Sequence, residues 1–303
     1  MSSWLGPLLL VTALVLIVGG AEVFFEALLE TAGRFRLSPF VLTLLVSGFE
    51  LENLAAGLAA NLKGLGQAAA GTFLGGTTFL ALAVPGVAAL ITPIEARLPL
   101  PVLLWSAAAP LPLLGLGSDG DLSRIDGAIL LGWFAVAMSG LAWSGRRLLG
   151  VPPTRPRRFP VVRMLVGLAL LSGAGELLGE GLHRVVSRFD VSEALLGNTA
   201  VAATVEAEEI ARVAVPAKRG RGDVAIGNVL GTIVHFAAFN AGVIALVRPI
   251  RLGHASRVLH LPVAAGSAVL LASLVAWRRR LGPSEAVLLI GLYALYVIAA
   301  IRY

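Results

Sequence analysis

Long apolar runs recur along the whole chain, and most of them are long enough to cross a bilayer. The 303 residues are 57% hydrophobic and only 14% charged, and the mean hydropathy is +0.87. A hydrocarbon core about 30 Å thick needs about 20 consecutive apolar residues in a helix. Transmembrane β-strands show only weak alternating segments, so closely spaced apolar runs with Gly and Pro predict helices. The sequence therefore predicts an all-α polytopic membrane protein. We expect about ten spans, near residues 4–31, 38–62, 66–91, 98–116, 124–145, 160–185, 192–216, 222–247, 258–277 and 283–302.

Composition excludes several other classes of protein. The chain has no cysteine, which excludes disulfides and thiolate metal sites. The net charge is +6, and the basic residues stand at helix ends, where they act as topology signals rather than as a nucleic-acid surface. The first apolar stretch has no basic segment before it and runs on past Gly20, so we expect a first span and not a removed leader. The expected partners are the lipid bilayer and inorganic cations, with no cofactor, and the oligomeric state is open.

The chain contains an internal duplication. Residues 19–38 match residues 173–192 at a constant offset, and after a two-residue gap residues 48–94 match 204–250. Apolar composition produces chance Leu and Ala matches, but it does not produce coincident Glu, Arg, Gly and Pro. The matched pairs include Glu22 with Glu176, Glu26 with Glu180, Arg34 with Arg188, Glu50 with Glu206, Glu52 with Glu208, Gly66 with Gly222, and Pro93 with Pro249.

The duplication predicts two five-helix halves of opposite topology. The first half is residues 1–145 with its motif at 19–94, and the second is 161–303 with its motif at 173–250; a basic connector, 146–160, joins them. Five helices separate matched residues, and because five is odd the copies enter the membrane from opposite sides. Inverted repeats around a site at the midplane are typical of secondary transporters with alternating access.

Loop charges predict the orientation. If the connector is cytoplasmic, that side holds fifteen Lys and Arg residues and the other side holds eight. Positive loops stay in the cytoplasm. We therefore expect a protein of the cell (inner) membrane with both termini outside.

Five carboxylates stand inside two apolar runs, one in each copy. A charged side chain at a bilayer centre costs about 2.5–3.5 kcal/mol, so five isolated ones would cost on the order of 12–18 kcal/mol. They must be compensated by protons, cations or arginines, and they indicate a functional site. The five are Glu50, Glu52, Glu206, Glu208 and Glu209.

Helical spacing divides these acids between two faces. Residues three apart share a face, so Glu50 lies with Asn53 and Glu206 lies with Glu209. If the two faces meet, three carboxylates and an amide offer the hard oxygen ligands that Ca²⁺ accepts. The alternative is a structural polar network, but three acids and one amide cannot satisfy one another without protons or a cation.

The remaining acids have less definite roles. Glu52 and Glu208 fall on the opposite face, where Glu208 is expected to pair with Arg212 four residues on, while Glu52 stays undecided. Glu22, Glu26, Glu176 and Glu180 either guard entry routes for cations or add to the field that attracts them. The alternative is a set of ion pairs near helix ends, Glu180 with Arg184 and Glu30 with Arg34.

One histidine also stands in an apolar stretch. His235 could carry a proton, but we favour a hydrogen-bonded core histidine. The sequence has no His-Glu-x-x-His stretch, no nucleophile beside a base and no aspartate pair in the spans, so an enzyme is not expected.

The second copy resembles the α-repeat of the sodium/calcium exchanger family, within the calcium/cation antiporter superfamily. The resemblance runs without a gap from Ser192 to Gly231, through Lys-Arg-Gly-Arg-Gly-Asp at 218–223 and Gly-Asn-Val-Leu-Gly at 227–231. The first copy is similar to the partner repeat from Gly20 to Ile94. The resemblance implies rocking of the first and sixth spans against the other helices.

The resemblance also assigns places in the family's Gly-Thr-Ser-x-Pro-Glu signature, whose Ser and Glu coordinate ions. Glu209 and Asn53 take the glutamate place, and Glu206 and Glu50 take the serine place. The next polar ligand becomes Thr77 in the first copy and Ile233 in the second, and Thr232 takes the preceding serine place. Extra carboxylates thus replace neutral sodium ligands.

These observations predict an antiporter that exchanges a divalent cation, Ca²⁺ before others, for H⁺ or Na⁺. The expected ion ligands are Glu50, Asn53, Glu206 and Glu209, with Glu52, Glu208, Thr77, Thr232, Glu22, Glu176 and His235 around them or along the access route. An Mg²⁺ or Mn²⁺ exporter of the same fold and a degenerate member that no longer transports are the alternatives.

Overall fold

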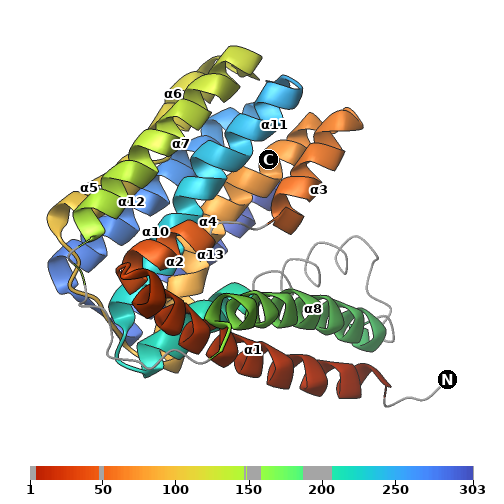
Figure 1. Cartoon of the computed structure of the whole chain (residues 1–303). Coiled ribbons are helices and arrows are strands. Elements are labelled where there is room, and N and C mark those ends of the chain that lie inside the picture. The colour runs from red at the N-terminus through yellow and green to blue at the C-terminus, as the bar shows by residue number, and fades with distance from the viewer. Residues whose placement is uncertain (1–4, 48–50, 147, 149–157, 187–206, 303) are drawn as a thin grey trace.

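Two groups of helices make up the molecule: an inclined pair, α1 and α8, and a bundle of the remaining helices (Figure 1). The computed structural model describes residues 5–47, 51–146, 148, 158–186 and 207–302. The first half contains α1 (Leu5–Phe35), α2 (Pro39–Ser47), α3 (Leu51–Leu62), α4 (Gly66–Ile91), β1 (Ile94–Glu95), α5 (Leu100–Ala108), α6 (Leu111–Leu116), η1 (Gly117–Asp119), β2 (Asp121–Leu122) and α7 (Arg124–Gly145).

The second half repeats this order. It contains α8 (Pro160–Val186), a helix over residues 207–218, α10 (Gly222–Val234), η2 (His235–Asn240), α11 (Ala241–Val247), β3 (Ile250–Arg251), η3 (Ser256–His260), α12 (Leu261–Arg278), β4 (Arg280–Leu281) and α13 (Pro283–Arg302). The elements η2 and η3 are π-helical turns that continue directly into α11 and α12.

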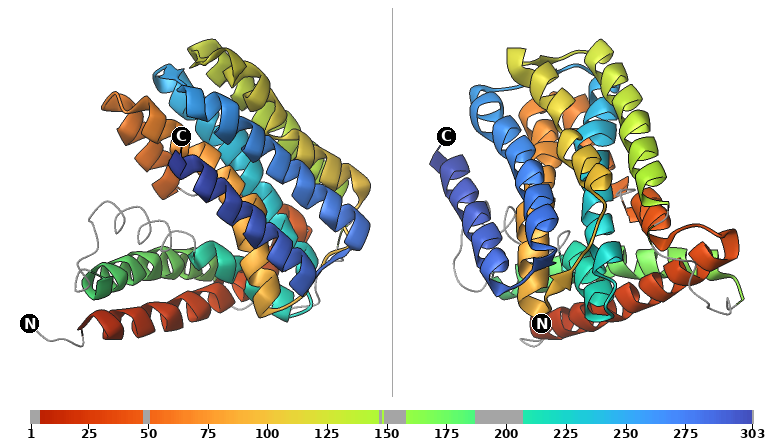
Figure 2. Two further views of the ribbon diagram at one scale, coloured as in Figure 1. Left: turned by 180° about the vertical axis from the view of Figure 1, so that it is seen from behind. Right: turned by 90° about the vertical axis from the view of Figure 1, so that its left-hand side faces the viewer.

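The pair α1 and α8 is antiparallel and closely packed. A Cβ on Gly181 would come within 3.0 Å of Leu10, and one on Gly167 within 2.6 Å of Phe24, so residue numbers rise along one helix as they fall along the other. Small residues allow such close approach of two membrane helices. The pair crosses the end of the bundle at a steep angle, as both views in Figure 2 show.

Two apolar cores follow this division. The larger contains buried residues of α2, α4, α5, α7 and α10 to α13, and the smaller lies mainly between α1 and α8. Helix 207–218 belongs to both, since Ala211 packs with the pair while Val213 and Ala217 pack with the bundle. This helix therefore links the two groups.

The two central helices, α4 in the first half and α10 in the second, run in opposite directions. A Cβ placed on Gly66, at the start of α4, would lie 3.6 Å from the carbonyl oxygen of Arg251. Its repeat mate Gly222, at the start of α10, lies against the carbonyl oxygen of Glu95. Each central helix thus begins where the central helix of the other half has ended, and matched glycines make matched contacts.

The short strands show the same exchange between halves. β1 pairs with β4, with Ile94 opposite Leu281, and β2 pairs with β3, with Leu122 opposite Ile250. Ile94 and Ile250 are repeat mates. Each strand that follows a central helix therefore pairs with a strand from the other half.

The expected membrane fold is confirmed, whereas the count of ten spans stays a prediction. Within the part of the chain that the structure describes, eight helices are long and apolar enough to cross a membrane. The expected span 38–62 is divided into α2 and α3 around residues 48–50, which lie outside the described residues. Only the second part of the expected span 192–216 is described.

The unequal space at the two matched glycines gives a testable prediction. Gly222→Ala should lower stability by about 1–3 kcal/mol, because the new methyl group overlaps a backbone carbonyl that cannot rotate away. Gly66→Ala makes only ordinary van der Waals contact and should leave stability unchanged or slightly raised. Thermal unfolding of the purified protein in detergent measures both, and equal effects would contradict the structure.

Candidate ion-binding site

Three charged side chains of helix 207–218 are withdrawn from solvent together. Glu208, Glu209 and Arg212 are 5%, 1% and 4% exposed. Arg212 follows the two acids by four and three residues, so one helical turn brings all three to the same side. Its Nη2 atom lies 2.8 Å from Glu208 Oε1 and 2.6 Å from Glu209 Oε1. A single guanidinium nitrogen therefore bridges both carboxylates.

The second carboxylate oxygen of Glu209 reaches the neighbouring helix. Asn228 of α10, 1% exposed, donates a hydrogen bond from Nδ2 to Glu209 Oε2 at 2.8 Å. Glu209 is thus held by an arginine of its own helix and by an amide of α10. This arrangement fixes the carboxylate between two buried elements.

Further polar residues follow Asn228 along α10 and η2. Thr232 donates from Oγ1 to the Asn228 carbonyl oxygen at 3.0 Å. His235 lies with Nδ1 2.9 Å from the Gly231 carbonyl oxygen and with its ring centroid 4.8 Å from that of Phe134. These contacts agree with the interpretation of His235 as a hydrogen-bonded core histidine.

The first copy contributes fewer buried groups to the described site. In α3, Asn53 is half-buried and Glu52 is exposed. Thr77 of α4 is buried and donates to the Phe73 carbonyl oxygen at 2.7 Å. The predicted ligands Glu50 and Glu206 lie outside the described residues, and the predicted ligand set stays untested.

Two predicted access residues, one on α1 and one on α8, lie at the surface. Glu22 and Glu176 are exposed. Arg219, in the loop before α10, lies 3.4 Å from Glu22 and 3.6 Å from Glu26, which joins α1 to the bundle by ion pairs. The predicted ion pair of Glu180 with Arg184 is confirmed, whereas the contact of Glu22 with Arg219 was not predicted.

A more buried ion pair joins α1 to α8. Arg163 of α8 donates from Nη1 to both oxygens of Glu30, at 2.8 and 2.7 Å. Glu30 is only 8% exposed, so its charge is neutralised inside the helix pair.

The described groups beside Glu209 are the carboxylate of Glu208, the guanidinium of Arg212 and the amide nitrogen of Asn228. Of these, the carboxylate oxygens are ligands that Ca²⁺ accepts. No group of three or more His, Asp or Glu side chains with metal-binding geometry occurs among the described residues. The two acids that would complete such a group, Glu50 and Glu206, are not among them.

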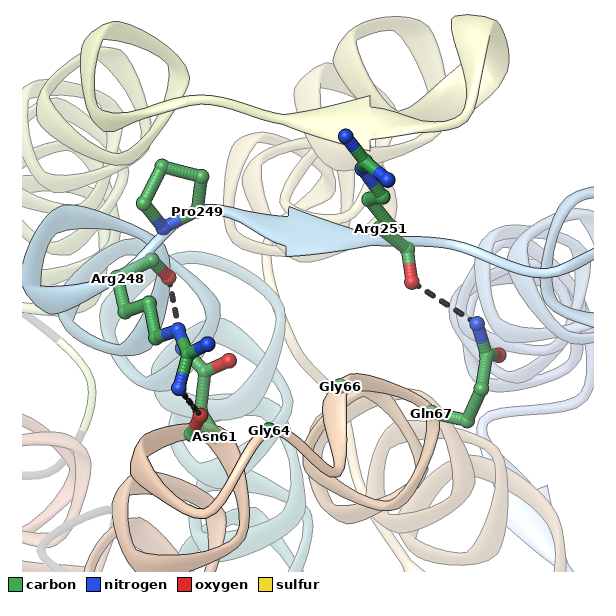
Figure 3. A pocket seen from close by; sticks show the side chains of 7 residues that line it. All are labelled: Asn61, Gly64, Gly66, Gln67, Arg248, Pro249 and Arg251. Atoms are coloured by element: carbon green, nitrogen blue, oxygen red, sulfur yellow. Dashed lines mark hydrogen bonds between the residues drawn. The ribbon is translucent and has the colours of Figure 1, made fainter.

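A separate pocket opens where α3 ends and α4 begins (Figure 3). It has a volume of about 520 Å³ and is lined by none of the predicted ion ligands. Asn61 donates to the Arg248 carbonyl oxygen at 2.7 Å, and Arg248 Nη1 donates to the Asn61 carbonyl oxygen at 3.1 Å. This reciprocal contact ties the end of α3 to the end of α11. The full lining consists of Asn61, Gly64, Gly66, Gln67, Arg248, Pro249 and Arg251.

Sequence reasoning predicted one contact of the site and missed two. The Glu208–Arg212 ion pair is confirmed. The contact of Arg212 with Glu209 was missed, although the three-residue spacing of the two residues was a signal for it. Asn228 was missed because its contact depends on how α10 packs against helix 207–218.

The helical fold, the apolar spans and the buried acids define a multi-pass membrane protein with a polar centre. The profile of the sodium/calcium exchanger protein family matches residues 5–143 and 159–302. The match covers nearly the whole chain, so the protein belongs to the sodium/calcium exchanger family.

Relatives of known sequence agree with this assignment. The antiporter candidate CaxA of Alkalimonas amylolytica is 28% identical over 284 residues, covering 86% of this chain and 87% of that protein. The inner membrane protein YrbG of Escherichia coli is 29% identical over 268 residues, covering 81% of each chain.

A solved structure shares the fold over almost its full length. The sodium-calcium exchanger NCX_Mj, soaked without Na⁺ and Ca²⁺, superposes with a TM-score of 0.84 at 24% identity, covering 98% of this chain and 99% of that one. The same exchanger soaked with 2.5 mM Na⁺ and 0.1 mM Ca²⁺ gives a TM-score of 0.83.

The ion pairs of α8 lead to a second prediction. Arg163→Gln should destabilise the protein by about 1–3 kcal/mol, because Glu30 loses its charged partner while it stays buried. Arg184→Gln removes a half-exposed partner of Glu180 one turn away, and such pairs contribute about 1 kcal/mol or less. Thermal unfolding in detergent compares the two, and equal losses would show that the burial of Glu30 is not what matters.

Proposed function

We propose that this protein is a secondary-active antiporter that exchanges a divalent cation, Ca²⁺ before others, for H⁺ or Na⁺. The observation that carries the proposal is Glu209, a carboxylate 1% exposed and held between two helices inside an apolar bundle. A charge in such a place is expensive and marks an ion pathway. Membership of the exchanger family supports cation antiport as the class of activity.

In this proposal the ion is held by Glu50, Asn53, Glu206 and Glu209, where the two copies meet. The hydrogen bonds that Asn61 donates to the carbonyl oxygens of Ile244 and Arg248 support that meeting, because they join α3, which carries Asn53, to the second half. The matched contacts of Gly66 and Gly222 support two inverted five-helix halves, residues 1–145 and 161–303. Rocking of α1 and α8 against the bundle would then expose the ion to alternate sides.

The choice of Ca²⁺ follows from the ligands and from the fold. Carboxylate-rich oxygen sites suit a divalent ion. The structure that shares this fold is a sodium-calcium exchanger, studied with Na⁺ and Ca²⁺. Mg²⁺ and Mn²⁺ are separated from Ca²⁺ by competition, since Mg²⁺ demands octahedral geometry and gives up its waters reluctantly.

Flux into proteoliposomes tests the proposal. Glu209→Gln should reduce Ca²⁺ uptake at least tenfold, because a contact with a charged group contributes about 1.5–3 kcal/mol. Glu180→Gln, an equal change at an exposed position of α8, should leave uptake intact. Undiminished uptake and unchanged counter-ion dependence in Glu209→Gln would refute the assignment.

A second candidate function is a member that no longer transports, and one observation favours it. Arg212 already neutralises Glu209, so the described site does not need an added cation. A ligand that binds only the folded protein stabilises it by about 2.7 kcal/mol when its free concentration is 100 times the dissociation constant. Stabilisation by Ca²⁺, Mg²⁺ or Mn²⁺ that disappears in Glu209→Gln favours transport, and no stabilisation by any of them favours the second function.

The proposed orientation has its own test. The chain has no cysteine, so single cysteines report topology without background. Ser118 precedes α7 and Arg158 precedes α8, so the expected span 124–145 separates them, and both are exposed. If the connector is cytoplasmic, a membrane-impermeant maleimide should label Ser118→Cys in cells whose outer membrane alone has been permeabilised. Arg158→Cys should be labelled only after the inner membrane is permeabilised as well. The reverse pattern would invert the assigned topology.

A further inference from the structure

The three buried charges of helix 207–218 are arranged in a way that a simple ion pair does not require. One nitrogen, Arg212 Nη2, donates a hydrogen bond to Glu208 Oε1 at 2.8 Å and lies 2.6 Å from Glu209 Oε1 as an ion pair, so a single nitrogen stands beside two carboxylates. A guanidinium stays protonated at all physiological pH values. The nitrogen therefore occupies the kind of position, between two carboxylate oxygens, in which a bound cation would stand.

Because Glu209 is buried, the position of Arg212 beside it depends on whether the transported ion is bound. Glu209 is almost completely removed from solvent, and a carboxylate in that environment needs a positive partner at every stage of a transport cycle. When no ion is bound, Arg212 is that partner. When an ion binds to Glu209, the ion is the partner, and the guanidinium must be held elsewhere.

Glu208 offers that second place. It is buried, adjacent to Glu209, and already in contact with the same nitrogen. The guanidinium can therefore leave Glu209 by a small movement without losing its ion pair.

We propose that Arg212 is a tethered cation that competes with the transported ion for Glu209, and that Glu208 holds the guanidinium while the ion is bound. This inference rests on the proposed function and adds a residue that determines ion selectivity. At Glu209, a monovalent ion that displaces the guanidinium replaces one positive charge by one and gains no attraction over it, whereas a divalent ion brings two positive charges to the same carboxylate. The tethered cation thus selects divalent over monovalent ions.

Cation titrations of the full-length protein in detergent test the inference, with thermal stabilisation by Ca²⁺ or Na⁺ as the readout. Arg212→Gln should bind Ca²⁺ about tenfold more tightly, equivalent to about 1.4 kcal/mol, and should gain stabilisation by Na⁺. Glu208→Gln should bind Ca²⁺ about tenfold more weakly, because the guanidinium then has only Glu209. Arg184→Gln, which removes an arginine from another pair of the same spacing, should bind as the wild type does.

The double variant Glu208→Gln/Arg212→Gln separates competition from a simple change of field. If Glu208 acts by holding Arg212, its removal should weaken Ca²⁺ binding by about threefold or less once Arg212 is absent. A full tenfold loss in that background would overturn the inference, as would an unchanged Ca²⁺ affinity in Arg212→Gln. If Arg212→Gln does not fold, the double variant is compared with Glu208→Gln: tighter Ca²⁺ binding in the double variant supports the inference, and equal or weaker binding overturns it.

These results differ from those that would refute the proposed function. If neither the wild type nor Arg212→Gln is stabilised by Ca²⁺, Mg²⁺, Mn²⁺ or Na⁺, the proposed function fails and the inference fails with it. If the wild type is stabilised but Arg212→Gln binds no more tightly, only the tethered cation is refuted.

Discussion

A carboxylate that has left water must find a positive charge, and much of this structure follows from that requirement at Glu209. Its two oxygens meet Arg212 and Asn228, so helix 207–218 and α10 are joined at a charged contact inside an otherwise apolar bundle. Such a contact is a poor source of stability, because desolvation of the two ions offsets their attraction. An apolar pair would hold the helices together at least as well. The charges are therefore better explained by ion handling than by folding.

The two halves meet by exchange of equivalent contacts. Gly66 lies against the residues of β3 and Gly222 against those of β1, and each of these strands pairs with a strand from the opposite half. A bundle built in this way has similar contacts at its two ends, with the polar residues between them. The inclined pair α1 and α8 stands outside this arrangement. It has its own apolar core, and ion pairs such as Arg219 with Glu22 attach it to the bundle.

The protein departs from the signature of its family where the charges are concentrated. By its resemblance to the family, Ile233 stands at a ligand place, and it is completely buried and unable to coordinate a cation. Carboxylates stand where the family has neutral residues, and an arginine lies among them. The additional carboxylates and the arginine together change the net charge of the site. In the proposed function, the balance of these fixed charges would set the number and kind of ions exchanged, together with the ligands themselves.

The sequence by itself determined the class of fold, the duplication and the acids that need compensation, because apolar length, matched residues and misplaced charge are all local properties of the chain. It also determined the Glu208–Arg212 pair, since helical spacing alone brings those two residues together. Only the tertiary structure decided that Asn228 holds Glu209 and that Arg163 holds Glu30. These partners stand on different helices, 19 and 133 residues apart, and their meeting depends on how the helices pack. Spacing along one helix carries no information about that packing.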